Sequence, residues 1–304
     1  MHVSFDFHRR ILTPVAAAVL GLLAVLAPAP AMAQVGFQSK APFAILMDGD
    51  SKAILYAKNI DDLMYPASMS KLMTAVMVFE AVQRGDLALD EEFFISEDAW
   101  RRGGESSGSS TMFAKLNSSI PLESLLRGVI VQSGNDASIA IAEGMYGTEA
   151  AFAEAMTARA RELGLTKSTF TNATGWPDPD HQMTTRELAL LARHIIYDLP
   201  EFYKYYSEKE FTWNGITQRN RNPLLYNYPG ADGLKTGFVK ESGYGLVASA
   251  QRKGRRLIAV VNGLKKRKDR GPEMRKLLDW GFRSFKRFVL FENGEQVGTA
   301  NVWG

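Results

Sequence analysis

The order of its patterns most constrains the fold of this chain, because strand-like runs lie toward both ends and helical runs lie between them. Residues 42–59 hold two short apolar runs around the turn 48–51 (DGDS), which predicts a hairpin. Residues 234–264 predict an antiparallel meander with a turn at Lys253-Gly254. Strands placed in this way can share one sheet if the helices pack on it. We therefore expect an α+β fold.

Helical spacing of apolar residues marks the segments between the two strand-rich parts. One helix is predicted from about Ser68 to Arg84, ending at Gly85, a residue that favours a helix C-terminus. Thr184 and Glu187 have the spacing of a capping box before a helix over 185–198. The polar stretch 101–110 predicts a loop. Further helices are expected over 122–132, 136–145, 150–163 and 272–286.

The first 33 residues have the parts of an export signal. Residues 8–10 (HRR) are basic, residues 11–26 are apolar, and Ala31-Met32-Ala33 matches an A-x-A cleavage site. The alternative is an uncleaved membrane anchor, but an apolar stretch of this length that contains Pro14 is short for a bilayer span. We predict a signal peptide over 1–33 and a mature protein that works outside the cytoplasm, in the periplasm or cell envelope.

Several kinds of site are excluded by what the sequence lacks. It has no cysteine, so thiolate-bound metals, thiol catalysis and disulfides are ruled out. A formal net charge of +3 is too small to indicate nucleic acid as a partner. No phosphate-binding or dinucleotide-binding glycine motif is present. Beyond the signal, the histidines are His181 and His194, too few for a zinc triad, and we interpret both as structural. We expect no cofactor and no metal.

The segment 66–80 (PASMSKLMTAVMVFE) places hydroxyl groups and a lysine at a predicted helix start. Residues three apart on a helix share a face, so Ser68 and Lys71 can meet, whereas Ser70 points away from the lysine. A free lysine has a pKa of about 10.4 and is a poor base, but burial or a nearby cation lowers that pKa. Ser68 is therefore a candidate nucleophile and Lys71 its candidate base, although one S-x-x-K match is weak evidence alone.

A second motif, S-G-N at 133–135, interrupts two predicted helices. The hydroxyl of Ser133 could relay a proton, and the amide of Asn135 could hold a substrate carbonyl. Taken singly, the motif is equally well an inter-helix turn.

The third motif, K-T-G at 235–237, begins a predicted strand. Lys235 could lower the pKa of Lys71 and attract a substrate carboxylate, while Gly237 would let a substrate backbone approach closely. S-x-x-K, S-x-N and K-T-G occur once each and in this order, which is the signature of penicillin-interacting serine enzymes.

Beyond these motifs, the chain resembles the D-alanyl-D-alanine carboxypeptidases, the low-molecular-mass penicillin-binding proteins of bacteria. The matching runs extend from about residue 41 to 285 and include YPASMSKLMT, LLRGVIVQSGNDASIAIAE, LGLTKSTFTNATGWPD, TQRNRNPLL, ADGLKTG, SGYGLVASA and KLLDWGF. The resemblance implies a β-lactamase/transpeptidase-like fold, with helices on both faces of an antiparallel sheet and an all-helical subdomain. It implies a catalytic domain over 34–286 and the beginning of a C-terminal β domain over 287–304.

The resemblance also implies a reaction. Ser68 would attack the bond between two terminal D-alanines of a peptidoglycan stem peptide, Lys71 would accept its proton, and Ser133, Asn135 and Lys235 would complete the network. β-Lactam antibiotics would acylate the same serine. By resemblance, the backbone N–H groups of Ser68 and Phe238 would form the oxyanion hole, and Thr236 and Arg270 would bind the terminal carboxylate, with Gly237 between Thr236 and Phe238. The basic neighbours of Arg270 in 265–271 are expected to be solvated surface charge.

The sequence departs from the family in two respects. Phe238 stands where the family often has histidine, from which we expect altered fit rather than lost activity. Family members usually carry a whole C-terminal β domain and a terminal amphipathic helix that attaches them to the membrane, and neither is evident here.

Three other functions stay open from the sequence. A β-lactamase of the same fold would need a glutamate in an E-x-x-L-N loop, and the match at Glu187 lacks the asparagine. A D,D-endopeptidase would use the same residues to cut cross-links. A non-catalytic penicillin-binding or penicillin-sensing protein would bind without turnover.

Overall fold

The structure is a computed structural model that describes residues 37–286, 288, 295–296 and 298. The predicted signal peptide at 1–33 and the predicted hairpin around Asn293-Gly294 lie outside the described residues. Residues from Ser39 onward form one compact unit, and this unit carries all of the motifs.

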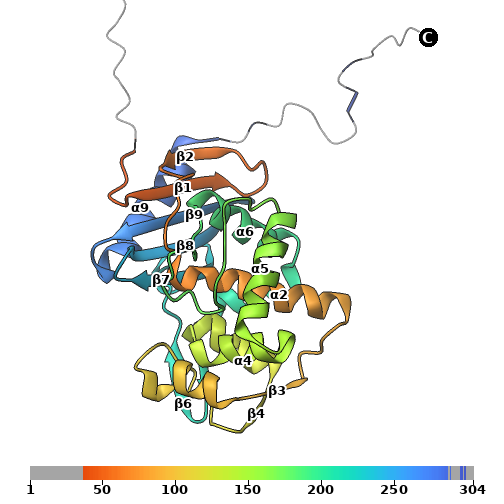
Figure 1. Ribbon diagram of the computed structural model, residues 1–304. Coiled ribbons are helices and arrows are strands. Elements are labelled where there is room, and N and C mark those ends of the chain that lie inside the picture. Colours follow the sequence, from red (N-terminus) through yellow and green to blue (C-terminus); the bar gives the residue numbers. More distant parts are fainter. Residues whose placement is uncertain (1–36, 287, 289–294, 297, 299–304) are drawn as a thin grey trace, which may run out of the picture. The chain divides into compact units, whose positions relative to one another are not determined.

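A five-stranded antiparallel sheet joins the two strand-rich parts of the sequence (Figure 1). Its order is β2-β1-β9-β8-β7, so the early hairpin pairs with the last strand of the later meander. The bounds are Phe43–Asp48 for β1, Ile54–Lys58 for β2, Ala231–Val239 for β7, Gly243–Arg252 for β8 and Arg255–Leu264 for β9. The predicted hairpin, meander and α+β class are confirmed.

Helices cover both faces of this sheet, as expected. On one face, α9 (Arg270–Ser284) approaches so closely that a Cβ on Gly281 would meet the side chains of Leu46 and Leu257. Because side chains alternate along a strand, Ile45 and Ile258 point to the other face. There they join one buried apolar core with α2 (Lys71–Arg84) and α6 (Thr185–Tyr197).

The rest of the unit is mainly helical and lies on the far side of α2 from the sheet in Figure 1. Its elements also include two short strand pairs that the sequence did not predict. The pairs are β3 (Glu92–Phe94) with β4 (Ser119–Pro121) and β5 (Glu210–Trp213) with β6 (Ile216–Arg219). The remaining helical segments are η3 (Ala99–Gly103), η4 (Glu105–Ser107), α3 (Leu122–Arg127), η5 (Gly128–Gln132), α4 (Asn135–Tyr146), α5 (Glu149–Glu162), α7 (Pro200–Tyr203), η6 (Lys204–Ser207), α8 (Leu224–Asn227) and η7 (Arg267–Asp269).

Local differences from the predicted elements have physical causes. The predicted helix from Ser68 begins as a 3₁₀ turn, η2 (Ala67–Ser70), and becomes α-helical only at Lys71. Gly85 ends it in a left-handed conformation, as predicted. The stretch 101–110 contains short helical turns instead of an open loop.

The predicted capping box forms only half of its hydrogen bonds. Thr184 Oγ1 accepts from the backbone N–H of Glu187, but the Glu187 carboxylate accepts from Lys167 N and Ser168 Oγ instead of returning to Thr184. Within the part of the chain that the structure describes, no helix is both long and apolar enough to cross a bilayer.

Candidate active site

Ser68 and Lys71 meet at the junction of η2 and α2. Lys71 Nζ donates to Ser68 Oγ over 3.3 Å, with the serine partly exposed and the lysine buried. Ser70 is buried, and its hydroxyl donates to the carbonyl of Ala67, so it stabilises the turn. The structure therefore brings together the pair that helix geometry selected from the sequence.

Gly237 fits this turn against the sheet. A Cβ at Gly237 would lie 2.8 Å from the backbone oxygen of Pro66 and 3.2 Å from Cβ of Ala67. The absence of a side chain thus lets strand β7 approach the segment that carries Ser68. The sequence analysis assigned this room to a substrate backbone. The structure corrects that reason, because the turn fills the space.

Lys71 lies in a buried polar environment that favours the neutral amine. Nζ donates to Asn135 Oδ1 over 2.6 Å and to the carbonyl oxygen of Thr174 over 2.5 Å. Burial, followed by the positive charge of Arg221, lowers the pKa of Lys71 to about 7, whereas the charges of Glu149 and Asp136 act in the opposite direction. The sequence analysis expected the cation to be Lys235, and it missed Arg221.

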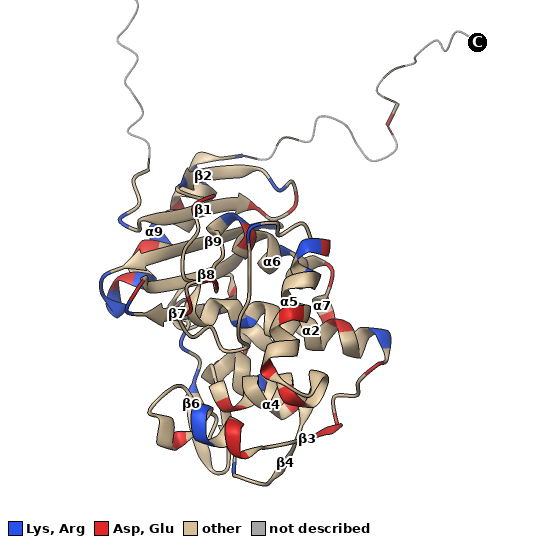
Figure 2. Cartoon of the chain, in the orientation of Figure 1, with Lys and Arg blue, Asp and Glu red and all other residues tan. Residues whose placement is uncertain are grey.

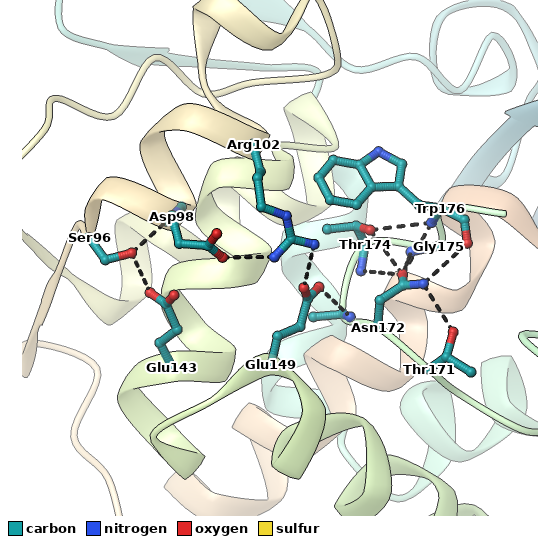
Figure 3. Close-up of polar contacts among 12 residues, drawn as sticks. Ser96, Asp98, Arg102, Glu143, Glu149, Thr171, Asn172, Thr174, Gly175 and Trp176 are labelled. Atoms are coloured by element: carbon teal, nitrogen blue, oxygen red, sulfur yellow. Dashed lines mark hydrogen bonds and ion pairs between the residues drawn. The ribbon is translucent and has the colours of Figure 1, made fainter. Parts of the chain in front are cut away.

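The loop that supplies the Thr174 carbonyl is fixed by one asparagine side chain (Figure 3). Asn172 Oδ1 accepts from the backbone N–H groups of Thr174, Gly175 and Trp176 at 2.7–3.1 Å. Glu149 reinforces the loop, since its carboxylate accepts from Ala173 N.

Glu149 is held in turn by a basic side chain. Its carboxylate accepts from Arg102 Nη2 at 2.9 Å, and Arg102 also pairs with Asp98 (Figure 3). The guanidinium of Arg102 lies 5.2 Å from the centre of the Trp176 ring. These contacts orient the acceptor for Lys71 from outside the three motifs.

The second motif brings a strained serine and an asparagine to the same place. Ser133 has φ of 62°, a left-handed conformation that is uncommon for a residue with a side chain. Its Oγ is buried and has no hydrogen-bond partner among the described residues. Asn135 Nδ2 donates to Ser109 Oγ, which fixes the amide so that its oxygen faces Lys71.

Buried Asp136 holds the adjacent loop against α4. Its carboxylate accepts from Thr111 Oγ1 and from the backbone N–H groups of Met112 and Ala114. Gly103 is required at this point, since a Cβ there would lie 2.2 Å from the backbone nitrogen of Asp136. The residues around S-G-N are thus a rigid support and not a free turn.

Lys235 is buried on β7 beside the first motif. Burial lowers the pKa of Lys235 well below its usual range, and the positive charges of Lys71, Arg221 and Arg270 act in the same direction. The two lysines therefore disfavour each other's charged form, although the structure attributes the effect on Lys71 to burial and Arg221.

A cavity of about 430 Å³ opens above this buried network. Lys71, Asn135 and Lys235 do not line it and lie buried nearby. The lining residues are Ser68, Ser110, Ser133, Arg221, Thr236, Gly237, Phe238, Tyr244, Arg267 and Arg270. The structure thus gathers all nine predicted site residues in or near one cavity, and adds Ser110, Arg221, Tyr244 and Arg267.

The rim of the cavity is aromatic and basic. Phe238 is 48% exposed and stacks on Tyr244, its cross-strand partner, with ring centres 4.1 Å apart. The guanidinium of Arg270 lies 5.5 Å from the centre of the Tyr244 ring. Burial, followed by the charge of Arg267, lowers the pKa of Arg270 to about 10. Arg267 is exposed as predicted for its segment, but it also lines the cavity, which corrects its assignment to solvated surface charge.

The cavity is electrostatically one-sided. Arg221, Arg267 and Arg270 line it, and none of its lining residues is acidic. Figure 2 shows basic residues on the segment that leads from β6 toward the sheet, which includes Arg221. A site of this kind attracts a carboxylate.

The two histidines take no part in this cavity. His181 Nδ1 accepts from the backbone N–H of Thr171, in agreement with its expected role in a loop, and burial lowers its pKa to about 4. His194 bonds Glu80 and Asp198 on the helical side. Among the described residues, no cluster of His, Asp and Glu has the arrangement of a metal site.

The family model for D-alanyl-D-alanine carboxypeptidase matches residues 29–266. The chain belongs to the D-alanyl-D-alanine carboxypeptidase family. D-alanyl-D-alanine carboxypeptidase DacA of Haemophilus influenzae is 43% identical over 261 residues, which cover 85% of this chain and 66% of that relative. The chain spans about two thirds of the length of the curated relatives DacA, DacC and DacD.

Solved structures of this family share the fold. Penicillin binding protein 5 from Haemophilus influenzae is similar with a TM-score of 0.79 and 44% identity, over 81% of this chain and 72% of that chain. Penicillin-binding protein D2 from Listeria monocytogenes, in its ampicillin-bound form, is similar with a TM-score of 0.71 and 30% identity, over 82% of this chain and 100% of that chain. The expected transpeptidase-like fold is confirmed.

Proposed function

We propose that this protein is a serine-type D-alanyl-D-alanine carboxypeptidase that removes the terminal D-alanine from peptidoglycan stem peptides and is acylated by β-lactams. One observation carries the proposal: Ser68 Oγ lies 3.3 Å from the amine of a buried lysine whose pKa is about 7, beside a cavity lined by cations. A lysine with that pKa is neutral in a large fraction of molecules at neutral pH and can act as a base.

Acylation follows from this geometry. The neutral amine of Lys71 accepts the proton of Ser68 while Oγ attacks the carbonyl carbon of the penultimate D-alanine. The carbon–nitrogen bond then breaks, and the leaving amine takes up a proton. The unpaired hydroxyl of Ser133 is in place to pass that proton, since it lines the same cavity. Asn135 and the Thr174 carbonyl hold Lys71 in position throughout.

Binding of the substrate uses the basic side of the cavity. Thr236 and Arg270 receive the terminal carboxylate, with Lys235 buried nearby. The backbone N–H groups of Ser68 and Phe238 stabilise the oxyanion, and both residues line the cavity. Phe238 replaces a polar histidine with an aromatic ring at the rim, where it contacts the substrate body and not the reacting bond.

Water completes the reaction by attacking the ester on Ser68, which releases the shortened peptide and restores the serine. A β-lactam would deacylate slowly, because no acidic side chain lines the cavity to activate water. Glu187, the residue closest to a lactamase motif, instead bonds Ser168 and Lys167 at a distance from this network in the sequence and outside the cavity lining. This argues for a carboxypeptidase over a β-lactamase.

We further propose that residues 1–33 are a cleaved signal peptide, that residues 34–286 are the catalytic domain, that residues 287–304 begin a C-terminal β domain, and that the mature protein acts in the periplasm or cell envelope. The enzyme's substrate lies in the cell wall, which supports this location. N-terminal sequencing of the secreted protein tests it, and a start other than Gln34 or its neighbours would contradict the predicted cleavage.

The decisive experiment incubates the purified protein with a diacetylated Lys-D-Ala-D-Ala tripeptide and, separately, with penicillin. Release of D-alanine together with a long-lived penicillin adduct on the peptide that contains Ser68 is expected. Ser68→Ala should abolish both, while Ser70→Ala is the matched control and should retain both. Fast penicillin hydrolysis without an adduct would favour a β-lactamase, and an adduct without D-alanine release would favour a penicillin-sensing protein.

A further inference from the structure

A second cavity of about 460 Å³ lies next to the first and is not used by the mechanism above. It is lined by Arg221, Pro223, Asn227, Arg267, Lys268, Arg270, Gly271, Pro272 and Arg275. Arg221, Arg267 and Arg270 line both cavities, so the two spaces share a wall of guanidinium groups. Each cavity alone has the size of an ordinary small-molecule site.

The position of this cavity relative to the reacting bond follows from the shared wall. Ser68 and Thr236 line only the first cavity, whereas Arg270, the expected partner of the terminal carboxylate, lines both. Moving away from Ser68 past the carboxylate therefore leads into the second cavity. On the proposed function, this is the side of the residue that leaves.

The charge of the two cavities exceeds what one carboxylate can balance. Five basic side chains line them, and neither lining contains an acidic residue. Arg221 donates to the neutral hydroxyl of Ser110, and Arg275 donates to the neutral amide of Asn227. Arg267 also lowers the pKa values of both Arg221 and Arg270, which is the sign of neighbouring cations without enough counter-charge.

One buried donor strengthens the case for a ligand. Arg270 is only 5% exposed, and its Nε has no hydrogen-bond partner among the described residues. A buried guanidinium without a partner is costly unless something else supplies an acceptor. Arg267 is the exposed member of the wall, on the short turn η7, so its side chain can move aside at little cost.

We propose that the second cavity receives the acidic side chain of the leaving residue, so that the enzyme cleaves D-alanyl bonds to amino acids that carry a second carboxylate as well as to D-alanine. The inference rests on the proposed function and extends it to the leaving group. The chemistry is unchanged: the carbonyl–nitrogen bond breaks, an ester forms on Ser68, and the released amine takes a proton. Two sources supply such a leaving group, namely a terminal acidic D-amino acid and the diaminodicarboxylic acid of a cross-linked partner strand.

The test compares acylated peptides that end in D-Ala-D-Ala, D-Ala-D-Gln and D-Ala-D-Glu. Gln and Glu have nearly the same shape, so the ratio of their kcat/KM values isolates the second charge. We expect Glu to exceed Gln about five-fold, the upper end for a partly exposed ion pair. The ratio should fall as salt is added. A peptide in which D-alanine acylates the amine of a diaminodicarboxylic acid distinguishes the cross-link source from the terminal source.

Variants then locate the effect. Lys268→Gln with Arg275→Gln changes only residues that line the second cavity and should abolish the preference while leaving the D-Ala-D-Ala rate unchanged. Lys276→Gln, on the same helix but outside the lining, is the matched control and should keep the preference. Equal rates for Glu and Gln in the unchanged enzyme, or equal losses for all peptides in the double variant, would overturn the inference.

A measurement without turnover separates this inference from the proposed function. The same peptides compete with labelled penicillin for Ser68, and their inhibition constants report binding alone. A five-fold advantage of Glu over Gln in competition supports the second site even if no D-alanine is released, a result that would contradict the carboxypeptidase proposal. Release of D-alanine with no advantage in competition or in rate would do the reverse.

Discussion

Lys71 Nζ lies 2.6 Å from Asn135 Oδ1, so a single hydrogen bond joins the first two motifs across 64 residues of sequence. The bond is buried, and its acceptor is held from the other side by Ser109. The base therefore depends on α4 for its position as much as on its own helix.

Removing this acceptor should slow acylation. Asn135→Ala leaves the Lys71 amine with one fewer acceptor in a buried place, a loss of about 1–3 kcal/mol. We expect the rate of acylation by labelled penicillin to fall roughly 10-fold to 100-fold. Ser109→Ala, which removes only the outer support, should fall much less. Equal rates in Asn135→Ala and the unchanged enzyme would show that the bond does not position the base.

The pH dependence of acylation should follow Lys71. Its pKa of about 7 means that the amine is protonated below that pH and cannot accept the serine proton. The acylation rate constant should therefore rise with pH and reach half of its maximum near pH 7. Stopped-flow measurement with a chromogenic β-lactam between pH 5 and 9 checks this; a profile that is flat over the range would exclude Lys71 as the titrating base.

Two substitutions should shift that profile in opposite directions. Arg221→Met removes a cation that lowers the pKa of Lys71, so the half-maximum should move to higher pH. Glu149→Gln removes a charge that raises this pKa, so the half-maximum should move to lower pH, while the amide can still accept from Ala173 N. Shifts of the same sign in both variants would point to a general structural disturbance instead of electrostatics.

Gly237→Ala should damage the site more than the fold. The added Cβ meets the Pro66 oxygen at 2.8 Å, and overpacking of this kind costs about 1–3 kcal/mol. The turn that carries Ser68 must shift to relieve it, so acylation should slow as well. Gly147→Ala is the control: its left-handed φ of 76° costs about 1–2 kcal/mol with nothing near the new Cβ. It should lower the free energy of unfolding and leave acylation unchanged.

His194 should make stability depend on pH. Its hydrogen bonds to Glu80 and Asp198 raise its pKa above the usual value, with Glu80 the larger cause. The stabilisation is complete below about pH 6.5 and is lost as pH rises through the raised value. The pKa of Glu80 is lowered to about 2, so its share persists at pH 5.5. His194→Gln should therefore cost about 1 kcal/mol at pH 5.5 and much less at pH 9 in urea unfolding. A larger loss at pH 9 would reverse the sign of the linkage.

The sequence predicted the parts of the site that are local in the chain. Ser68 and Lys71 are three residues apart, and the change from helical to strand spacing near residue 234 marked the strand that carries K-T-G. Each motif is short, and each depends on residues that are neighbours in sequence, so spacing alone could place it.

What the sequence could not predict depends on tertiary packing. Arg221 comes close to Lys71 only because the segment after β6 returns to the sheet, and the Thr174 carbonyl reaches Lys71 across 103 residues of sequence. Tyr244 was within reach of prediction, since counting back from the turn between β7 and β8 pairs it with Phe238. The backbone reason for Gly237 required the position of Pro66, which no spacing rule gives.

The tight contact between Gly237 and Pro66 also determines where this enzyme can change over evolution. The nucleophile's turn and the sheet edge touch through main-chain atoms, which are the same whatever the side chains, so mutation has little freedom to move the serine. Variation in tolerance to antibiotics must then arise at the exposed rim, at Phe238 and Arg267, where an altered side chain changes which molecules enter without disturbing the machinery beneath. The histidine-to-phenylalanine difference at position 238 is where such divergence would be sought first.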